Sequence, residues 1–157
     1  MTFHLNTQFG GLPLASPVIV GVSPISMNEP TRVAMQQAGA GAIVLPSLFE
    51  EQVIDWSWNA GRRITGRERH LLEHSDRTQH NWVCPDADSY LALVNRASSL
   101  QTIPIIASLN GFTAGGWMDF AGELQEAGAA AIELNVHHSH ANEMERHQMR
   151  LLPSIVA

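Results

Sequence analysis

Short apolar runs alternate along this chain with longer stretches in which apolar side chains recur at helical spacing. The runs are too short for independent helices and suit strands that are covered on both faces; they lie at 17–21, 42–45, 103–109 and 131–136. The helical stretches lie at 28–38, 86–100 and 116–127, and a further helix at 142–150 leads to another strand from 152. Asn28 can cap the first helix, and Asp86 or Asp88 can cap the second. The pattern predicts alternating parallel strands and helices.

One segment of this pattern occurs twice. The sequence AGAGAIVL at 38–45 returns as AGAAAIEL at 127–134, which is 127 − 38 = 89 positions later. In each copy a helix is expected to end at a glycine, and small residues lead into a strand. We predict that Gly128 caps its helix in the left-handed conformation, which glycine adopts without steric cost. The two copies indicate a repeated βα plan.

A small antiparallel hairpin is expected before the first of these strands. Gly10 and Gly11 suit the turn between its two arms, and Pro13 suits an edge strand, which does not need the N–H that proline lacks. We expect this hairpin to cover one end of the domain.

The order of elements predicts an α/β fold of the TIM-barrel type, here a partial (β/α) barrel of about four to five parallel strands preceded by the hairpin. An open doubly wound sheet is the alternative that periodicity leaves open. It is less favoured as a dinucleotide-binding fold, because no G-x-G-x-x-G or Walker-type loop follows a predicted strand.

The stretch 52–85 lacks a regular pattern and is predicted to be a long irregular insertion within one domain, 1–157. It is rich in tryptophan, arginine and histidine. The segment could cover an active site as a lid, or bind an anionic substrate through arginine side chains. A solvated insertion with short helical pieces is the other interpretation that stays open.

Composition narrows the classes of function. The formal net charge of −6 argues against a general nucleic-acid or membrane surface, and 45% apolar residues fit a globular chain of 157 residues. The single cysteine, Cys84, excludes an intrachain disulfide, and no stretch reaches the length of a membrane span. These features predict a soluble cytoplasmic protein.

Four separated segments carry a family resemblance, and they follow one another in order over nearly the whole chain. They resemble the N-terminal half of a dihydroorotate dehydrogenase-like flavoprotein: LPLASPVIVGVSP at 12–24, AGAGAIVLPSLFEEQ at 38–52, IPIIASLNG at 103–111 and AGAAAIELN at 127–135. The resemblance implies a TIM barrel that carries FMN at the C-terminal ends of its strands. It also implies oxidation of a CH–CH bond of a dihydropyrimidine by hydride transfer to the flavin, in pyrimidine biosynthesis.

Carried over position by position, the resemblance implies flavin contacts from both backbone and side chains. The residues are Gly21, Val22, Ser47, Ser108, Asn110 and Asn135. Asn135 is also expected to contact the substrate. Amide side chains donate and accept hydrogen bonds, so they can contact the edge of an isoalloxazine or a pyrimidine without adding a charge.

Two positions depart from the family pattern. Pro46 stands where the family usually has a lysine, and His138 stands where the family has its Ser or Cys base. We predict His138 as the catalytic residue, because an imidazole accepts a proton near neutral pH. The group His137, His138 and His140 also suits a transition metal or a histidine-rich loop without a ligand, and no metal site is assigned.

Three functions are therefore expected to compete. The first is an FMN-dependent oxidoreductase of dihydroorotate dehydrogenase-like type, of which this chain forms the N-terminal half. The second is a non-catalytic fragment or assembly subunit, and the third is a barrel isomerase or lyase without flavin. The family's later strands supply a flavin-contacting lysine and the loops that hold the FMN phosphate. We thus expect this chain alone to bind FMN weakly or not at all, and to associate with itself or with a partner that supplies the C-terminal half-barrel.

Overall fold

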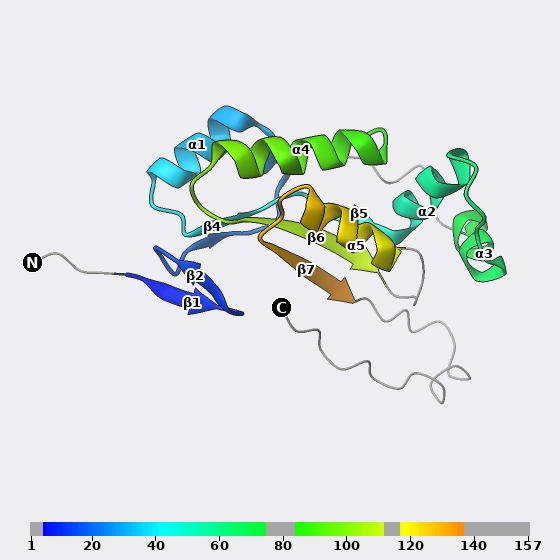
Figure 1. Cartoon of the computed structure of the whole chain (residues 1–157), viewed down its shortest axis with the longest axis horizontal. Coiled ribbons are helices and arrows are strands. Elements are labelled where there is room, and N and C mark those ends of the chain that lie inside the picture. Colours follow the sequence, from blue (N-terminus) through cyan, green and yellow to red (C-terminus); the bar gives the residue numbers. More distant parts are fainter. Residues whose placement is uncertain (1–4, 75–83, 112–116, 137–157) are drawn as a thin grey trace, which may run out of the picture.

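A parallel β-sheet organises the part of the chain that the structure, a computed structural model, describes: residues 5–74, 84–111 and 117–136 (Figure 1). The elements follow in the order β1 (Thr7–Phe9), β2 (Leu12–Leu14), β3 (Ile19–Val20), the 3-10 helix η1 (Pro24–Met27), α1 (Glu29–Gln37), β4 (Ala42–Val44), β5 (Leu48–Phe49), α2 (Glu50–Asn59), α3 (Gly66–His74), α4 (Ala87–Leu100), β6 (Ile105–Gly111), α5 (Trp117–Glu126) and β7 (Ala131–Val136). The fold is α/β, with the antiparallel hairpin β1–β2 ahead of a sheet of parallel strands. None of the described helices combines the length and the apolar character needed to cross a membrane.

Strand β6 is the centre of the sheet. Val44 of β4 and Ala131 of β7 are both in register with Ile106, so β4 and β7 lie on opposite sides of β6. Strand β5 pairs with the later part of β6 on the same side as β4, and β3 pairs with the free side of β4. If β4 and β5 are counted as one interrupted strand, the strands therefore lie side by side in the order in which they occur in the chain.

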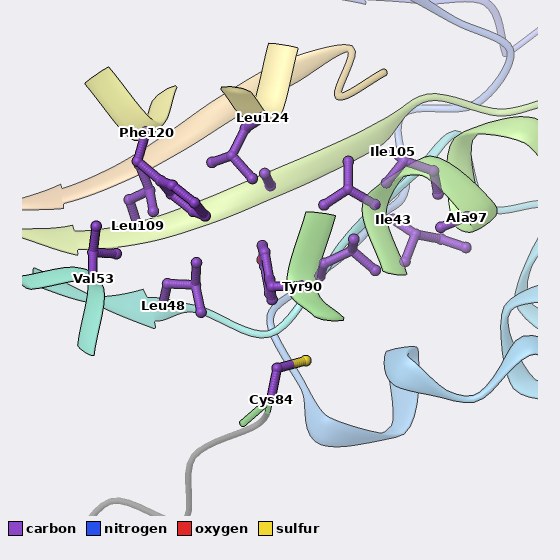
Figure 2. Close-up of a cluster of buried hydrophobic side chains, with 13 residues drawn as sticks. Ile43, Leu48, Val53, Cys84, Tyr90, Ala97, Ile105, Leu109, Phe120 and Leu124 are labelled. Carbon is purple, nitrogen blue, oxygen red and sulfur yellow. The ribbon is translucent and has the colours of Figure 1, made fainter. Parts of the chain in front are cut away.

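The helices of the described residues contribute to a core on one face of this sheet. Side chains alternate between the two faces of a strand, and Ile105, Ala107 and Leu109 of β6 point into that core. Figure 2 shows the partners that the helices supply, which include Val53 of α2, Tyr90 and Ala97 of α4, and Phe120 and Leu124 of α5.

The opposite face of the sheet carries a smaller apolar cluster that consists of strand residues. Leu14 of the hairpin packs there against Ala42, Val44 and Ile106, near the starts of β4 and β6. The hairpin thus covers one end of this face. We call it the helix-free face, because no residue of a described helix belongs to its cluster.

The two copies of the repeated segment form the same structure, as predicted. Gly39 and Gly128 have φ values of 94° and 105°, in the left-handed region. In each copy the residue after the glycine donates its N–H to the carbonyl five residues earlier at 3.1 Å, which ends the helix. The next residue, Gly41 or Ala130, then bonds to a carbonyl at or next to the start of the preceding strand, at 2.7 and 2.8 Å.

Local sequence signals also set the other helix ends. Asn28 accepts a hydrogen bond from the Thr31 N–H at 3.3 Å, which confirms the first predicted N-cap. Of the two candidates for α4, Asp86 is the cap, since it accepts from the Ser89 N–H at 2.7 Å, whereas Asp88 lies in the first turn. The predicted hairpin turn is confirmed as well, with positive φ at both of its glycines.

Two of the predicted strands are not covered on both faces. Strand β3 contains only Ile19 and Val20, and the neighbouring Val18 is 58% exposed. Strand β7 has the predicted bounds, but Leu134 is 37% exposed. Both strands lie at edges of the described sheet, whereas β4 and the first five residues of β6 are buried. The prediction of full burial therefore holds for the inner strands and is wrong for the outer ones.

The stretch 52–85 is more regular than the sequence pattern predicts. It contains most of α2 and all of α3, and Gly61, which follows the C-cap residue Ala60 of α2, has a φ of 77°. The short helical pieces of one interpretation are therefore present, but the stretch is not simply solvated, since Gln52, Val53 and Ile54 are buried. Residues 75–83 lie outside the described residues, as do the helix and strand predicted for 142–150 and from 152 onward.

Candidate functional site

Four polar side chains meet on the helix-free face, toward the C-terminal ends of the strands. The hydroxyl oxygens of Ser47 and Ser108 are 2.8 Å apart. The Ser108 hydroxyl donates to Oε1 of Glu133 at 3.0 Å. The amide nitrogen of Asn135 donates to the Ser108 oxygen at 3.2 Å and to the same Glu133 oxygen at 3.1 Å. We call these residues the Ser-Glu-Asn cluster.

Strand geometry explains why three of the four members meet. Ser108 on β6 and Glu133 on β7 are direct partners in the parallel register. Asn135 follows Glu133 by two positions, so the two side chains lie on the same face of β7. The apolar side chains of this face, including Ile106, lie closer to the strand starts.

Ser47 reaches the cluster from the break between β4 and β5. Pro46 lacks the N–H that a continuous ladder would use, and the strand resumes only at Leu48. Tyr90, which is fully buried, donates its hydroxyl to the Pro46 carbonyl at 2.7 Å and so holds this break from the helix-covered side. Burial raises the pKa of Tyr90 above its usual range, which keeps the hydroxyl in its donating form.

The cluster is accessible although its centre is buried. Ser108 has no exposed surface, whereas Ser47, Glu133 and Asn135 are each partly exposed. A buried polar group is stable only when it is hydrogen-bonded, and Ser108 is contacted by all three neighbours. The arrangement therefore combines a fixed centre with polar groups that a ligand can reach.

The other predicted site residues do not join this cluster. Asn110 lies in β6, in register with Asn135, and is partly exposed. Gly21 and Val22 follow β3 at an edge of the sheet, where both are exposed. A Cβ atom built on Gly21 meets no heavy atom of the described residues within 4 Å, so the absence of a side chain there is not required by packing. His138 lies outside the described residues.

Glu133 is the member of the cluster that sequence reasoning did not single out. It belongs to the repeated segment, where it occupies the position of Val44 in the first copy. The available clue was its spacing of two from Asn135, which places both on one face of a strand. Glu133 could have been identified as unusual because the first copy of the repeat has the apolar residue Val44 at the same strand position.

Apart from the Ser-Glu-Asn cluster, the surface has a hollow between α2, α5 and the segment before α3. It has a volume of about 110 Å³ and is lined by Val53, Ile54, Ser57, Arg62, Arg63, Ile64, Glu68 and Asp119. Arg62 also lies 3.8 Å from the carboxylate of Glu123. Acidic and basic groups alternate around this hollow, so it does not form the uniformly basic surface that an anion site in 52–85 would need.

Metal ligands do not gather within 5–74, 84–111 and 117–136. No group of three or more histidine, cysteine, aspartate or glutamate side chains is placed there to hold an ion. The histidines considered for such a role, His137, His138 and His140, lie outside those ranges.

Comparison with known proteins does not assign a function to this site. No family model matches the chain, and no match to it was found among curated proteins. The function proposed below therefore depends on the arrangement of the residues and on the sequence resemblance.

Proposed function

We propose that this chain forms part of an FMN-dependent oxidoreductase of dihydroorotate dehydrogenase-like type, acting on a CH–CH bond. The observation that supports it best is the Ser-Glu-Asn cluster, because it lies toward the C-terminal ends of adjacent parallel strands. α/β proteins with parallel sheets bind their ligands at that end. Three of the residues that the resemblance assigns to the flavin, Ser47, Ser108 and Asn135, belong to the cluster.

We further propose that the sheet is part of a (β/α) barrel. Its strand lines are adjacent in chain order, and the described helices supply buried core residues to one face. A doubly wound sheet places helices on both faces and reverses its strand order at a switch point. The observed order therefore favours the barrel, whose interior would be the helix-free face.

The residues of this face suit part of a flavin. Asn135 and Ser47 offer uncharged polar atoms for the ring edge, and the open space at the Cβ position of Gly21 permits a close approach of the ring to the backbone. FMN, when bound, would supply the hydride acceptor. The carboxylate of Glu133 makes the cluster unsuitable for the phosphate, which we assign to residues outside it. The proton acceptor proposed for the reaction is His138, three positions after Asn135.

An incomplete barrel explains the weak FMN binding that we expect of this chain alone. Strands β3 and β7 are edges of the described sheet, and unpaired strand edges favour association with another strand. We propose that a second copy or a partner chain completes the ring. If association occurs without any flavin binding, the alternative of a non-catalytic assembly subunit is favoured instead.

The proposal can be tested by titrating the full chain with FMN while recording the flavin absorbance and ¹⁵N-resolved NMR spectra. We expect a dissociation constant of roughly 0.1–1 mM, with the largest shifts at Gly21, Ser47, Ser108 and Asn135. The variant S108A should weaken binding about tenfold, because it removes the centre of the cluster. Its matched control is S99A, which removes an exposed hydroxyl from α4.

The outcomes separate the competing functions. An unchanged flavin spectrum at millimolar FMN, at every association state of the chain, would contradict the proposal. Equal FMN affinity of S108A and S99A would place the flavin elsewhere. Tight binding of a phosphorylated metabolite without flavin would favour the isomerase or lyase.

A further inference from the structure

We infer that Glu133 fixes the direction of the hydrogen bonds in the Ser-Glu-Asn cluster, so that the oxygen atoms of Ser47, Glu133 and Asn135 that remain available on the helix-free face act as acceptors. The group that binds there is then an N–H donor of an uncharged cyclic amide, and a ligand carboxylate at this position is disfavoured. This inference concerns substrate selection and rests on the function proposed above.

The direction follows from counting protons. An ionised carboxylate has no proton to donate, so the hydrogen atom between Ser108 and Glu133 comes from the Ser108 hydroxyl. A serine hydroxyl has one hydrogen. The 2.8 Å bond between Ser47 and Ser108 must therefore be donated by Ser47. Both hydroxyl hydrogens are then used inside the cluster.

The orientation of the Asn135 amide is fixed by the same carboxylate. Its nitrogen donates to Oε1 of Glu133 at 3.1 Å and to the oxygen of Ser108 at 3.2 Å. The flipped amide would place its oxygen 3.1 Å from a carboxylate oxygen, where two acceptors repel each other. Asn135 thus directs its nitrogen inward and keeps its oxygen for other partners.

What the cluster retains for a ligand is a set of acceptors. These are the Oδ1 atom of Asn135, the Oε2 atom of Glu133 and the lone pairs of the Ser47 oxygen. No hydrogen bond within 5–74, 84–111 and 117–136 is recorded to the first two atoms. A ligand carbonyl or carboxylate would face oxygen atoms without a hydrogen between them, whereas a ring N–H would find a partner.

The lack of basic side chains near the cluster also disfavours a ligand carboxylate. The sequence contains no lysine, and the arginines of the described residues lie on α1, α3 and α4 and in the segment before α3. The ion pair seen in that part of the chain joins Arg62 to Glu123 and leaves Glu133 without a basic partner there. A carboxylate bound against the cluster would therefore meet the Glu133 charge without compensation from these groups.

Ligand-observed NMR on the full chain, without flavin turnover, tests the inference with three ring compounds. They are 5,6-dihydrouracil, its 1,3-dimethyl derivative, which lacks N–H groups, and 5,6-dihydroorotate, which adds a carboxylate. We expect dihydrouracil to bind about tenfold more tightly than the dimethyl compound, because the latter leaves the acceptors unpaired. Dihydroorotate should bind about fivefold or more weakly than dihydrouracil.

The variant E133Q removes the charge while it keeps the size of the side chain, and should reduce the preference for dihydrouracil over dihydroorotate at least fivefold. The control E126Q makes the same change at an exposed position at the end of α5 and should leave the preference unaltered. Equal binding of the dimethyl compound, preference for dihydroorotate, an unaltered ratio in E133Q, or no binding of dihydrouracil would each overturn the inference. The FMN titration is separate: flavin binding without ring selectivity leaves the proposed oxidoreductase standing.

Discussion

Gly41 provides the sharpest test of the packing between the segment that follows the hairpin and the start of β4. A Cβ atom added to Gly41 would lie 1.9 Å from the carbonyl oxygen of Ser16 and 2.9 Å from its carbonyl carbon. Ordinary contact begins at 3.4 Å, so the two segments would have to separate by 3.4 − 1.9 = 1.5 Å. Both groups belong to the backbone and cannot be relieved by a rotamer change. The same movement would strain the 2.7 Å hydrogen bond from the Gly41 N–H to the Val18 carbonyl.

The expected effect of G41A combines these two terms. Overpacking costs about 1–3 kcal/mol, and a lost backbone hydrogen bond costs about 0.5–1.5 kcal/mol. We therefore expect the free energy of unfolding to fall by about 2–4 kcal/mol, and Tm to fall by roughly 5–15 °C for a domain of this size. Urea unfolding followed by circular dichroism measures the first quantity, and differential scanning calorimetry measures the second.

The matched control is G122A on α5. Gly122 is exposed, and a Cβ atom there meets no described heavy atom within 4 Å. Alanine exceeds glycine in helix propensity by about 1 kcal/mol, so this variant should be slightly more stable than the parent chain. If G41A were as stable as G122A, the close approach of Ser16 to the start of β4 would be refuted.

Three further outcomes follow from individual contacts. Replacing Tyr90 by phenylalanine leaves the buried Pro46 carbonyl without its 2.7 Å donor and should cost about 1–3 kcal/mol at pH 7 in urea unfolding. Burial raises the pKa of Tyr90, so the stabilising effect of its hydroxyl is complete below about pH 10 and is lost as the pH rises further. The stability of Y90F should therefore fall less steeply at alkaline pH than that of the parent chain. Identical stability profiles against pH would contradict this. Hydrogen bonds from Ser89 lower the pKa of Asp86, so stability should fall as the pH falls below about 4, and D86N should lack that component in acid titrations of Tm. G21A should leave Tm within about 1 °C of the parent because packing does not require a glycine there, while FMN affinity falls if the ring approaches this backbone.

The predictions that succeeded used signals confined to a few neighbouring residues. An asparagine or aspartate cap, a glycine that must take positive φ, and a paired-glycine hairpin turn depend on local backbone geometry. The bounds of β7 and the helix beginning after Asp86 could be predicted for that reason. Burial of the outer strands could not, because it depends on which faces the helices cover and on which strands lie at the edge.

Helix α2 shows why a local signal can also be overlooked. It begins at Glu50 without a side-chain cap, and its sequence mixes charged residues with tryptophan. Its two first-turn glutamates favour the positive end of the helix dipole, and Gly61 ends the helix with positive φ. These features were present in the sequence, but the cluster of arginines that follows made the whole stretch look irregular.

Another unpredicted feature is a buried arginine that joins α1 to its neighbours. Arg32 is 1% exposed and donates to the carbonyls of Ser26 and Met27 and to the side chain of Gln101. Burial lowers its pKa. On a helical wheel this position is not distinguishable from a solvated one, because its acceptors come from η1 and from the end of α4, 69 residues away for Gln101.

In the candidate site, too, only contacts between residues close in sequence could be predicted, whereas contacts between different strands could not. The sequence places Glu133 and Asn135 on one face of a strand, since they are two residues apart. It does not reveal that Ser108 is opposite Glu133, that Ser47 reaches Ser108 across the break in the neighbouring strand, or that the carboxylate accepts from both Ser108 and Asn135. The sequence resemblance assigned Asn135 a flavin-edge or substrate contact with an amide that both donates and accepts. Because its nitrogen donates to Glu133 and Ser108, the asparagine turns its oxygen toward a ligand, and the carboxylate beside it thereby determines which atom of the amide the ligand meets.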